Sequence, residues 1–157
     1  MSAFVTKADA PAPAAEPLIA IDGFWPAIDP AKLRSAQKVA ETTTPDRLGA
    51  VIAAAIATVL RDLAAWGVTQ QEAGFITLAD VPALSIGGAS ANVRAWHRAV
   101  GLLAKAELIE RTRDLDTTGA GDRRADVMDP AVAELRRDAT HAVRDILGRG
   151  RSIVELI

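Results

Sequence analysis

The chain has no cysteine and no tyrosine, and its aromatic residues are three tryptophans and three phenylalanines among 157 residues. Without cysteine, disulfides and thiolate metal sites are excluded, and two histidines offer little for a tight metal site. The formal net charge of −2 lacks the basic excess common in nucleic-acid binders. Stability must therefore come from a hydrophobic core, and a chain of this length can bury about 68–70% of its unfolded surface.

Enzyme and membrane signals are also missing. The sequence has no Ser-His-Asp set and no paired carboxylates in a known catalytic arrangement. Gly87-Gly88 precedes a predicted helix, but the lysine of a P-loop and the spacing of a dinucleotide site are absent. The opening residues MSAFVTKADA lack the apolar core of a secretion signal, and no apolar run reaches membrane-spanning length. We therefore expect no enzymatic activity, no cofactor and no membrane partner.

Residues 44–74 are predicted to form the helix around which the chain is organised. Thr44 is a suitable N-cap, Pro45 fits the first helical position, and Gly74 fits a left-handed C-cap. At 1.5 Å per residue this helix would be about 40 Å long. Apolar residues recur along it at helical spacing: Leu48, Val51, Ile52, Ala55, Ile56, Val59, Leu60, Leu63 and Trp66.

Three further helices are predicted from caps and periodicity. One begins at Asp29-Pro30 and runs to about residue 41, and another covers residues 91 to about 114. The last begins at a second cap-then-proline pair, Asp129-Pro130, and ends at Gly148. The apolar stripe of the third helix consists of Val93, Trp96, Val100, Leu103, Ala104 and Leu108, and that of the last consists of Val132, Leu135, Ala139, Val143, Ile146 and Leu147.

The segment between the long helix and the third helix is expected to be a loop. Pro82 limits any strand there, and residues 85–90 read as a flexible turn in which Ser90 caps the following helix. Four apolar residues of the loop are expected to be buried against the end of the long helix: Phe75, Ile76, Leu78 and Val81.

These elements predict an all-α fold, a small bundle of about four helices with extended N- and C-terminal segments. We expect a flexible, extended N-terminal arm over residues 1–29, a helical bundle over 30–148 and an apolar C-terminal tail over 149–157. Phe24-Trp25 at the end of the arm has two interpretations: an anchor that pins the arm to the bundle, or a contact for a neighbouring subunit. The tail is expected to pack on another subunit, because its large apolar residues need burial. The alternative is that it covers the open end of its own bundle.

Several blocks of the sequence resemble the head-completion proteins of peduovirus-type contractile-tailed phages, the GPL family. The first blocks are the GFWPAID motif and a GFITLADVP segment, and the last ends in VELI. The densest block runs from residue 102 to 126, with an ERTRDLDTT run followed by Arg124-Ala125. Together the matching blocks cover about residues 22–157 in the family's order and spacing.

The resemblance implies a structural function. Such proteins dock as a ring on the portal vertex of the DNA-filled head, stabilise the packaged DNA and provide the attachment surface for the neck and tail. The implied partners are the portal protein, neighbouring copies in a ring that is about twelvefold by analogy, and a downstream neck or tail-completion protein. Packaged DNA would pass through the channel without sequence-specific binding. The implied location is the host cytoplasm during assembly and then the virion neck.

The predicted interface rests on the blocks that match the family and on large apolar residues near the chain ends that need burial. Asp114, Asp116 and Asp122 could suggest calcium, but the terminal glutamate of an EF-hand loop is missing, so capping of backbone groups is preferred. The expected interface residues are Phe24, Trp25, Asp114, Asp116, Thr117, Thr118, Arg123, Arg124, Ile153, Val154, Leu156 and Ile157.

Two other functions remain open at this stage. Capped helices with Arg123-Arg124 and Arg136-Arg137 are compatible with a small helical DNA-binding regulator, although the charge is balanced. A small helical hydrolase is the third possibility, but no nucleophile–base pair is recognisable. Salt-dependent duplex binding would distinguish the regulator, and pelleting with portal-containing heads would distinguish the connector.

Overall fold

The computed structural model describes residues 16–21, 23–113 and 119–150, with the backbone alone for Arg113 and residues 119–130. The predicted all-α class is confirmed, because helices dominate the described residues and the single sheet has two very short strands. The elements are α1 (Pro30–Ala36), α2 (Pro45–Glu72), β1 (Ser85–Ile86), β2 (Ala89–Ser90), α3 (Ala91–Arg113) and α4 (Gly119–Ile146).

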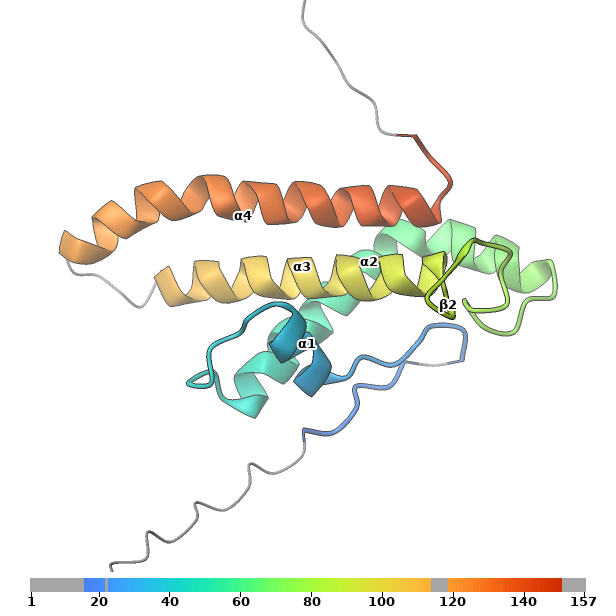
Figure 1. The fold of residues 1–157 in the computed structure, drawn as a ribbon, viewed down its shortest axis with the longest axis horizontal. Coiled ribbons are helices and arrows are strands. Elements are labelled where there is room, and N and C mark those ends of the chain that lie inside the picture. Colours follow the sequence, from blue (N-terminus) through green and yellow to red (C-terminus); the bar gives the residue numbers. More distant parts are fainter. Residues whose placement is uncertain (1–15, 22, 114–118, 151–157) are drawn as a thin grey trace, which may run out of the picture.

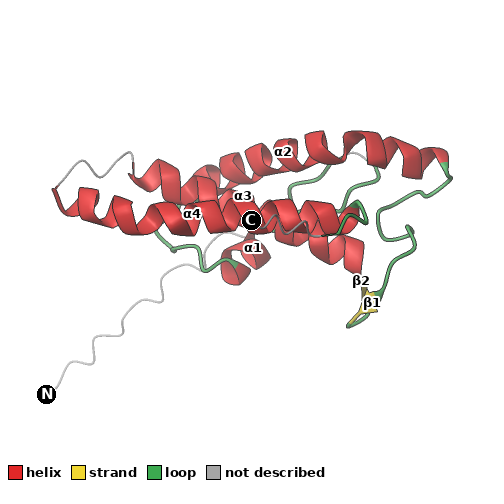
Figure 2. Cartoon of the chain, turned by 90° about the horizontal axis from the view of Figure 1, so that it is seen from above, coloured by secondary structure: helices red, strands yellow, loops and turns green. Residues whose placement is uncertain are grey.

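The helices form an elongated molecule in which α3 is central. α4 runs antiparallel beside α3 and contacts it along its length, while α2 crosses the bundle and packs mainly against α3 (Figures 1 and 2). α1 is short and lies against α2 (Figure 1). Side chains from all four helices and from the N-terminal segment share one hydrophobic core, which includes Leu48, Ile52, Leu63, Trp96 and Val100.

α2 forms as predicted. The Thr44 hydroxyl accepts a hydrogen bond from the backbone N–H of Arg47 at 3.3 Å, and Pro45 occupies the first helical position. The chain leaves the helix through Gly74 at φ +94°. By length and composition α2 could cross a membrane, but its apolar stripe is part of the core of this bundle.

α1 is shorter than predicted and ends at Ala36. Asp29 caps its start by accepting hydrogen bonds from two backbone N–H groups, as expected. Lys38 then turns the chain with φ +50°, and the N–H of Val39 donates back to the carbonyl of Arg34 at 2.9 Å. This left-handed turn ends the helix and brings the Val39 side chain into the core.

α4 begins earlier than predicted. Its backbone is helical from Gly119, so Asp129-Pro130 lies inside the helix and does not start it. A proline within a helix removes one backbone hydrogen bond, a local cost that pairing with a neighbouring helix can offset. Here α4 lies beside α3 (Figure 1). The predicted C-terminal end is confirmed, with Gly148 at φ +65° after Ile146.

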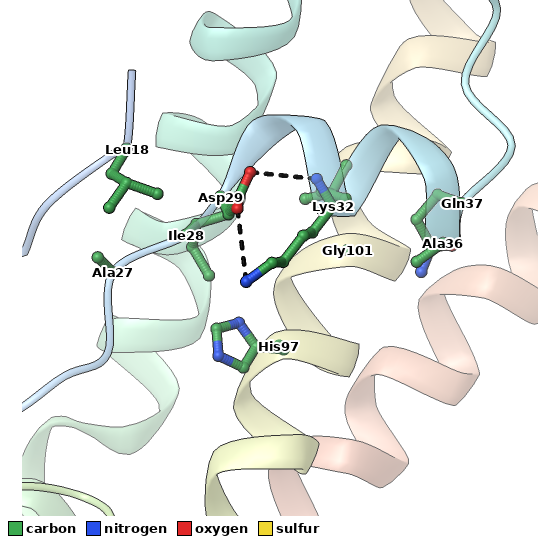
Figure 3. Close-up of a pocket in the computed structure, with 10 residues that line it drawn as sticks. Leu18, Ala27, Ile28, Asp29, Lys32, Ala36, Gln37, His97 and Gly101 are labelled. Atoms are coloured by element: carbon green, nitrogen blue, oxygen red, sulfur yellow. Dashed lines mark hydrogen bonds and ion pairs between the residues drawn. The ribbon is translucent and has the colours of Figure 1, made fainter. Parts of the chain in front are cut away.

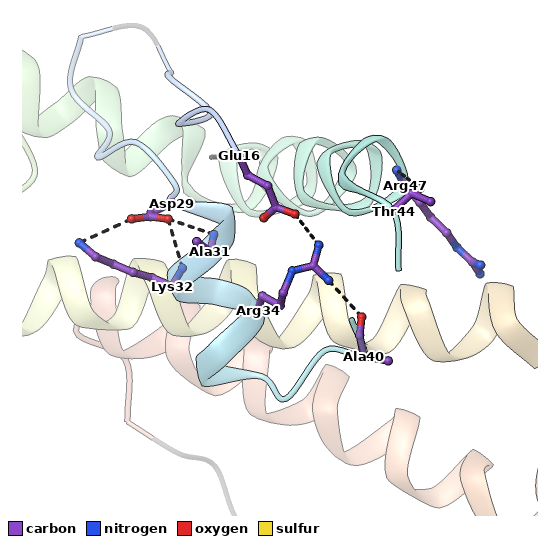
Figure 4. A network of polar contacts seen from close by, with 8 residues as sticks. All are labelled: Glu16, Asp29, Ala31, Lys32, Arg34, Ala40, Thr44 and Arg47. Atoms are coloured by element: carbon purple, nitrogen blue, oxygen red, sulfur yellow. Dashed lines mark hydrogen bonds and ion pairs between the residues drawn. The ribbon is translucent and has the colours of Figure 1, made fainter. Parts of the chain in front are cut away.

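The N-terminal segment is tied to the bundle from Ile19 onward. Ile19 and Ile28 exchange two backbone hydrogen bonds, at 2.8 and 2.9 Å, in an isolated antiparallel bridge. The Arg34 guanidinium binds the Glu16 carboxylate and donates to the Ala40 carbonyl at 3.0 Å (Figure 4). The division into an arm, a bundle and a tail stays a prediction. Within the predicted arm, the side chains that pack on the hydrophobic core are Ile19, Ile21, Phe24, Trp25 and Ile28.

Candidate assembly interface

The GFWP motif forms an aromatic cluster inside the bundle. We use this name for Phe24, Trp25, Trp66 and Trp96. The Trp25 ring stacks on Trp96 with centroids 4.9 Å apart, and Phe24 meets Trp25 edge to face at 5.0 Å. The Trp96 indole N–H donates to the carbonyl of Pro26 at 3.1 Å. The motif is therefore an anchor that pins the N-terminal segment to α2 and α3.

Two predicted interface residues, Phe24 and Trp25, belong to this cluster. Phe24 keeps only 4% of its surface exposed, whereas Trp25 is partly exposed. Trp25 also covers Gly67 so closely that a Cβ there would lie 2.8 Å from its ring. A contact of this motif with a neighbouring subunit stays a prediction, and Phe24 offers it little surface.

The other predicted interface residues lie at the margins of the described structure. Arg123 and Arg124 lie in α4, where the backbone alone is described. The remaining members lie outside the described residues: Asp114, Asp116, Thr117, Thr118, Ile153, Val154, Leu156 and Ile157. Their roles in contacts between subunits stay predictions.

The structure shows an exposed apolar surface that the sequence pattern had not indicated. Leu78 and Val81 are buried as expected and Phe75 is partly buried, but Ile76 is 81% exposed, so its predicted burial is wrong. Leu84 and Ile86 are 78% and 53% exposed in the same segment, which lies at one end of the long molecule (Figures 1 and 2). Large apolar residues that are exposed at one end of a molecule are candidates for a contact with another protein.

Residues 84–90 form an ordered turn, which we call the docking hairpin. Gly87 and Gly88 have φ of +56° and +76°, the left-handed pair that a two-residue hairpin turn requires. The Arg94 guanidinium donates to the Ile86 carbonyl at 2.8 Å, and the Ala91 N–H donates to the Leu84 carbonyl at 2.8 Å. The predicted flexible turn is thus a β-hairpin fixed to the start of α3.

The predicted cap at Ser90 is wrong. Its hydroxyl is buried and has no hydrogen-bond partner within the part of the chain that the structure describes. Ser90 lies in β2 and pairs with Ser85 of β1, so it is the last residue of the hairpin. The signal that could have revealed this hairpin is the Gly87-Gly88 pair, because two glycines between short strands are typical of a two-residue hairpin turn.

The outer face of α2 is a second uncharged surface. From Leu48 to Leu60 the helix has no charged residue, and Ala50, Ala53 and Ala57 are exposed on it. Small side chains allow another helix to approach closely. This face is therefore a second candidate surface for a contact with another protein.

Charges on α3 and α4 are mixed in sign, and three ion pairs involve the side chains of these helices that the structure describes. Arg136 on α4 binds Glu110 on α3 at 2.6 Å, and Arg98 lies 3.6 Å from Asp138. Arg111 binds Glu107 one turn away on α3 at 2.5 Å. Such exposed pairs add little stability. Because acidic residues lie beside these arginines, this surface is not the uniformly basic one that is typical of a duplex-binding helix.

An open groove of about 520 Å³ lies between the N-terminal segment, α1 and α3 (Figure 3). We call it the α1 groove. Partial burial, and secondarily the positive charge of Lys32, lower the pKa of His97 below its usual 6.5. The residues that line the groove are Leu18, Ala27, Ile28, Asp29, Lys32, Leu33, Ala36, Gln37, His97 and Gly101.

Metal-binding chemistry has no support in the described part of the chain, which holds no group of three or more histidine and acidic residues placed to bind an ion. Asp114 and Asp116 lie outside that part, and Asp122 belongs to the stretch of α4 described by its backbone. The preference for capping over calcium at these aspartates stays a prediction.

Comparison with known proteins agrees with the resemblance seen in the sequence. The family model described as phage head completion protein (GPL) matches residues 19–157. The head completion/stabilization protein of Escherichia phage P2 is 40% identical over 142 residues, which cover 90% of this chain and 84% of that protein. No solved structure matches the chain. Since the family match extends over most of the sequence, the chain belongs to the GPL family of phage head completion proteins.

Proposed function

We propose that this protein completes phage heads, by docking as a ring on the portal vertex of the DNA-filled head. The exposure of Ile76, Leu84 and Ile86, all in the segment between α2 and α3, supports this proposal most directly. Burial of large apolar side chains against a partner is favourable, so this segment is suited to a contact with another protein. The P2 relative, whose name includes head completion and stabilization, supports the same role.

The ring would continue the portal channel, stabilise the packaged DNA and present the surface to which the neck or tail-completion protein attaches. Its symmetry would follow the portal, and DNA would pass without sequence-specific binding. The protein would act in the host cytoplasm during assembly and then reside in the virion neck. It would be a structural component and not an enzyme.

We further propose that the purified protein is monomeric or loosely associated and forms rings only on a portal. A ring formed early in solution would compete with assembly on the portal. Sedimentation velocity without portal should show a species near the 16.5 kDa chain mass. A tight ring at low concentration would contradict this order of assembly.

Residues 114–126 and the apolar residues at 153–157 are proposed as contacts with portal or with a neighbouring copy. The first segment is polar, and it carries the densest family match, which a solvated turn alone would not lead us to expect. Replacing Asp116 and Arg124 together by alanine should leave the thermal unfolding midpoint unchanged but lower incorporation into heads. Normal incorporation of this double variant would contradict the proposed contact.

The decisive experiment adds the purified protein to portal-containing heads that lack it, and then pellets the heads. We expect the protein to pellet with heads and to reduce DNA loss, while portal-free heads serve as the control. Protein that stays in the supernatant with both would contradict head docking. Duplex binding that weakens steeply with salt would instead indicate the DNA-binding regulator.

A further inference from the structure

Two apolar surfaces of this chain lack a partner, and they lie in different places. The docking hairpin exposes Leu84 and Ile86, which are two residues apart in an extended segment and therefore point to the same side. The α1 groove is open, and Leu18 on its wall is 63% exposed. One surface projects from the bundle, and the other is a hollow lined mainly by apolar side chains (Figures 2 and 3).

These two surfaces cannot meet within one chain. The hairpin is fixed at the first turn of α3 by the hydrogen bonds from Arg94 and from the Ala91 N–H. The groove is lined on α3 by His97 and Gly101, six and ten residues beyond Ala91, or about 9 and 15 Å at 1.5 Å per residue. The hairpin is therefore held away from the groove of its own chain.

We propose that the docking hairpin of one copy inserts Leu84 and Ile86 into the α1 groove of the next copy. This inference rests on the proposed ring and specifies the contact that builds it. The contact joins two different surfaces, so each added copy leaves one hairpin and one groove free for further copies. Such heterologous contacts close into a ring when the rotation between copies is a whole fraction of a turn, which a symmetric portal would impose.

The Asp29–Lys32 pair in the groove tolerates an apolar occupant. The Asp29 carboxylate already accepts from the N–H groups of Ala31 and Lys32, at 3.0 and 3.1 Å, and pairs with the Lys32 ammonium at 3.6 Å (Figures 3 and 4). Filling the groove therefore leaves no newly unpaired carboxylate. The Lys32 side chain is 87% exposed, so it can stay in water while the hollow beneath it is filled.

The absence of cysteine gives a direct test by site-specific crosslinking. Leu84→Cys places a thiol on the hairpin, and Ala36→Cys places one at the exposed groove wall. The double variant is bound to portal-containing heads and treated with a short bismaleimide reagent. The matched control combines Ala36→Cys with Val68→Cys, an exposed apolar residue on α2.

If the hairpin enters the neighbouring groove, the double variant gives a ladder of covalent oligomers beyond the dimer. A persistent contact should yield about tenfold more crosslinked product than the Val68 control, because it raises the effective concentration of the paired thiols. A mixture of the two single variants should stop at the dimer, because each copy then carries only one of the two thiols. Products joined only from hairpin thiol to hairpin thiol, or a ladder no stronger than the control, would overturn the proposal.

The same samples separate this inference from the proposed function. Pelleting with heads is measured before the reagent is added. A double variant that pellets normally but gives no ladder refutes the hairpin–groove contact and leaves head docking intact. If the unsubstituted protein fails to pellet, head docking itself is refuted, and with it the ring on which this contact depends.

Discussion

The aromatic cluster and the docking hairpin are both apolar features next to turns, yet one is buried and the other is exposed. Trp96 is fully buried and its indole N–H is satisfied by Pro26. Leu84 is 78% exposed although its backbone carbonyl is held by the N–H of Ala91. The difference shows that apolar character alone does not decide between core and interface. What decides it is whether the chain brings a second apolar surface to the same place.

The largest effect is expected from Trp96→Ala. Removing a large, fully buried aromatic side chain costs about 3–5 kcal/mol of unfolding free energy. The substitution also leaves the Pro26 carbonyl without its donor and Trp25 without its stacking partner. Urea unfolding followed by circular dichroism measures the loss. A loss below about 1 kcal/mol would mean that the cluster is not part of the core, and the contrast with the hairpin would fail.

Gly67→Ala tests how tightly the cluster is packed. The new Cβ would lie 2.8 Å from the Trp25 ring, which is itself stacked on Trp96 and cannot move freely. Overpacking costs about 1–3 kcal/mol, and the better helix propensity of alanine offsets up to about 1 kcal/mol, so we expect a net loss of about 1–2 kcal/mol.

Gly49→Ala is the matched control in the same helix. Apart from its chain neighbours and the nearby backbone of its own helix, no described atom lies within 4 Å of the position where its Cβ would be placed. The substitution should therefore stabilise the protein by about 0.5–1 kcal/mol. Equal effects at Gly49 and Gly67 would show that helix propensity alone acts, without a specific contact to Trp25.

Leu84→Asp examines the hairpin side of the comparison. An exposed substitution away from buried groups should change the unfolding free energy by no more than about 0.5 kcal/mol. Binding to heads should nevertheless be lost, because a carboxylate would enter an apolar contact. Val68→Asp on α2 is the control for added charge and should pellet normally. A sharp fall in the melting temperature of Leu84→Asp would place this residue in the core of its own chain.

His97 gives the smallest effect. Because its pKa is lower in the folded protein than the usual 6.5, the unfolded chain takes up the proton first as the pH falls. Stability should therefore decrease as the pH drops through about 6.5 and level off below the pKa of the folded state. Melting temperatures of His97→Gln should show a weaker decrease between pH 8 and 5 than those of the unsubstituted protein. Parallel curves would mean that the groove does not perturb His97.

The sequence predicted the elements whose local and long-range signals agree. The caps at Asp29 and Thr44, the apolar stripe of α2 and the buried face of α3 all appear where the pattern placed them. In these places capping residues and helical periodicity give the same answer, and the folded chain reproduces it.

The predictions that were wrong concern positions where tertiary packing overrides a local sequence signal. Asp129-Pro130 resembles a helix start, yet the backbone continues through it beside α3. Lys38 has a positive φ, which the sequence does not predict because glycine or asparagine is usual at such a position. Ile76 carries the same apolar character as Leu78 but has no covering element. None of these outcomes can be derived from neighbours in the sequence, because each depends on residues that are distant along the chain.

The bond from Trp96 to Pro26 also imposes an order on folding. Its two residues are 70 positions apart, and Leu78 likewise donates its N–H to the carbonyl of Phe24. During synthesis the N-terminal segment leaves the ribosome first, but its binding surface is incomplete until the start of α3 has followed. Closing so long a loop is costly until the contacts at its ends form, so the segment should dock late. The first part of the chain to be made would then be among the last to become protected from proteases and hydrogen exchange.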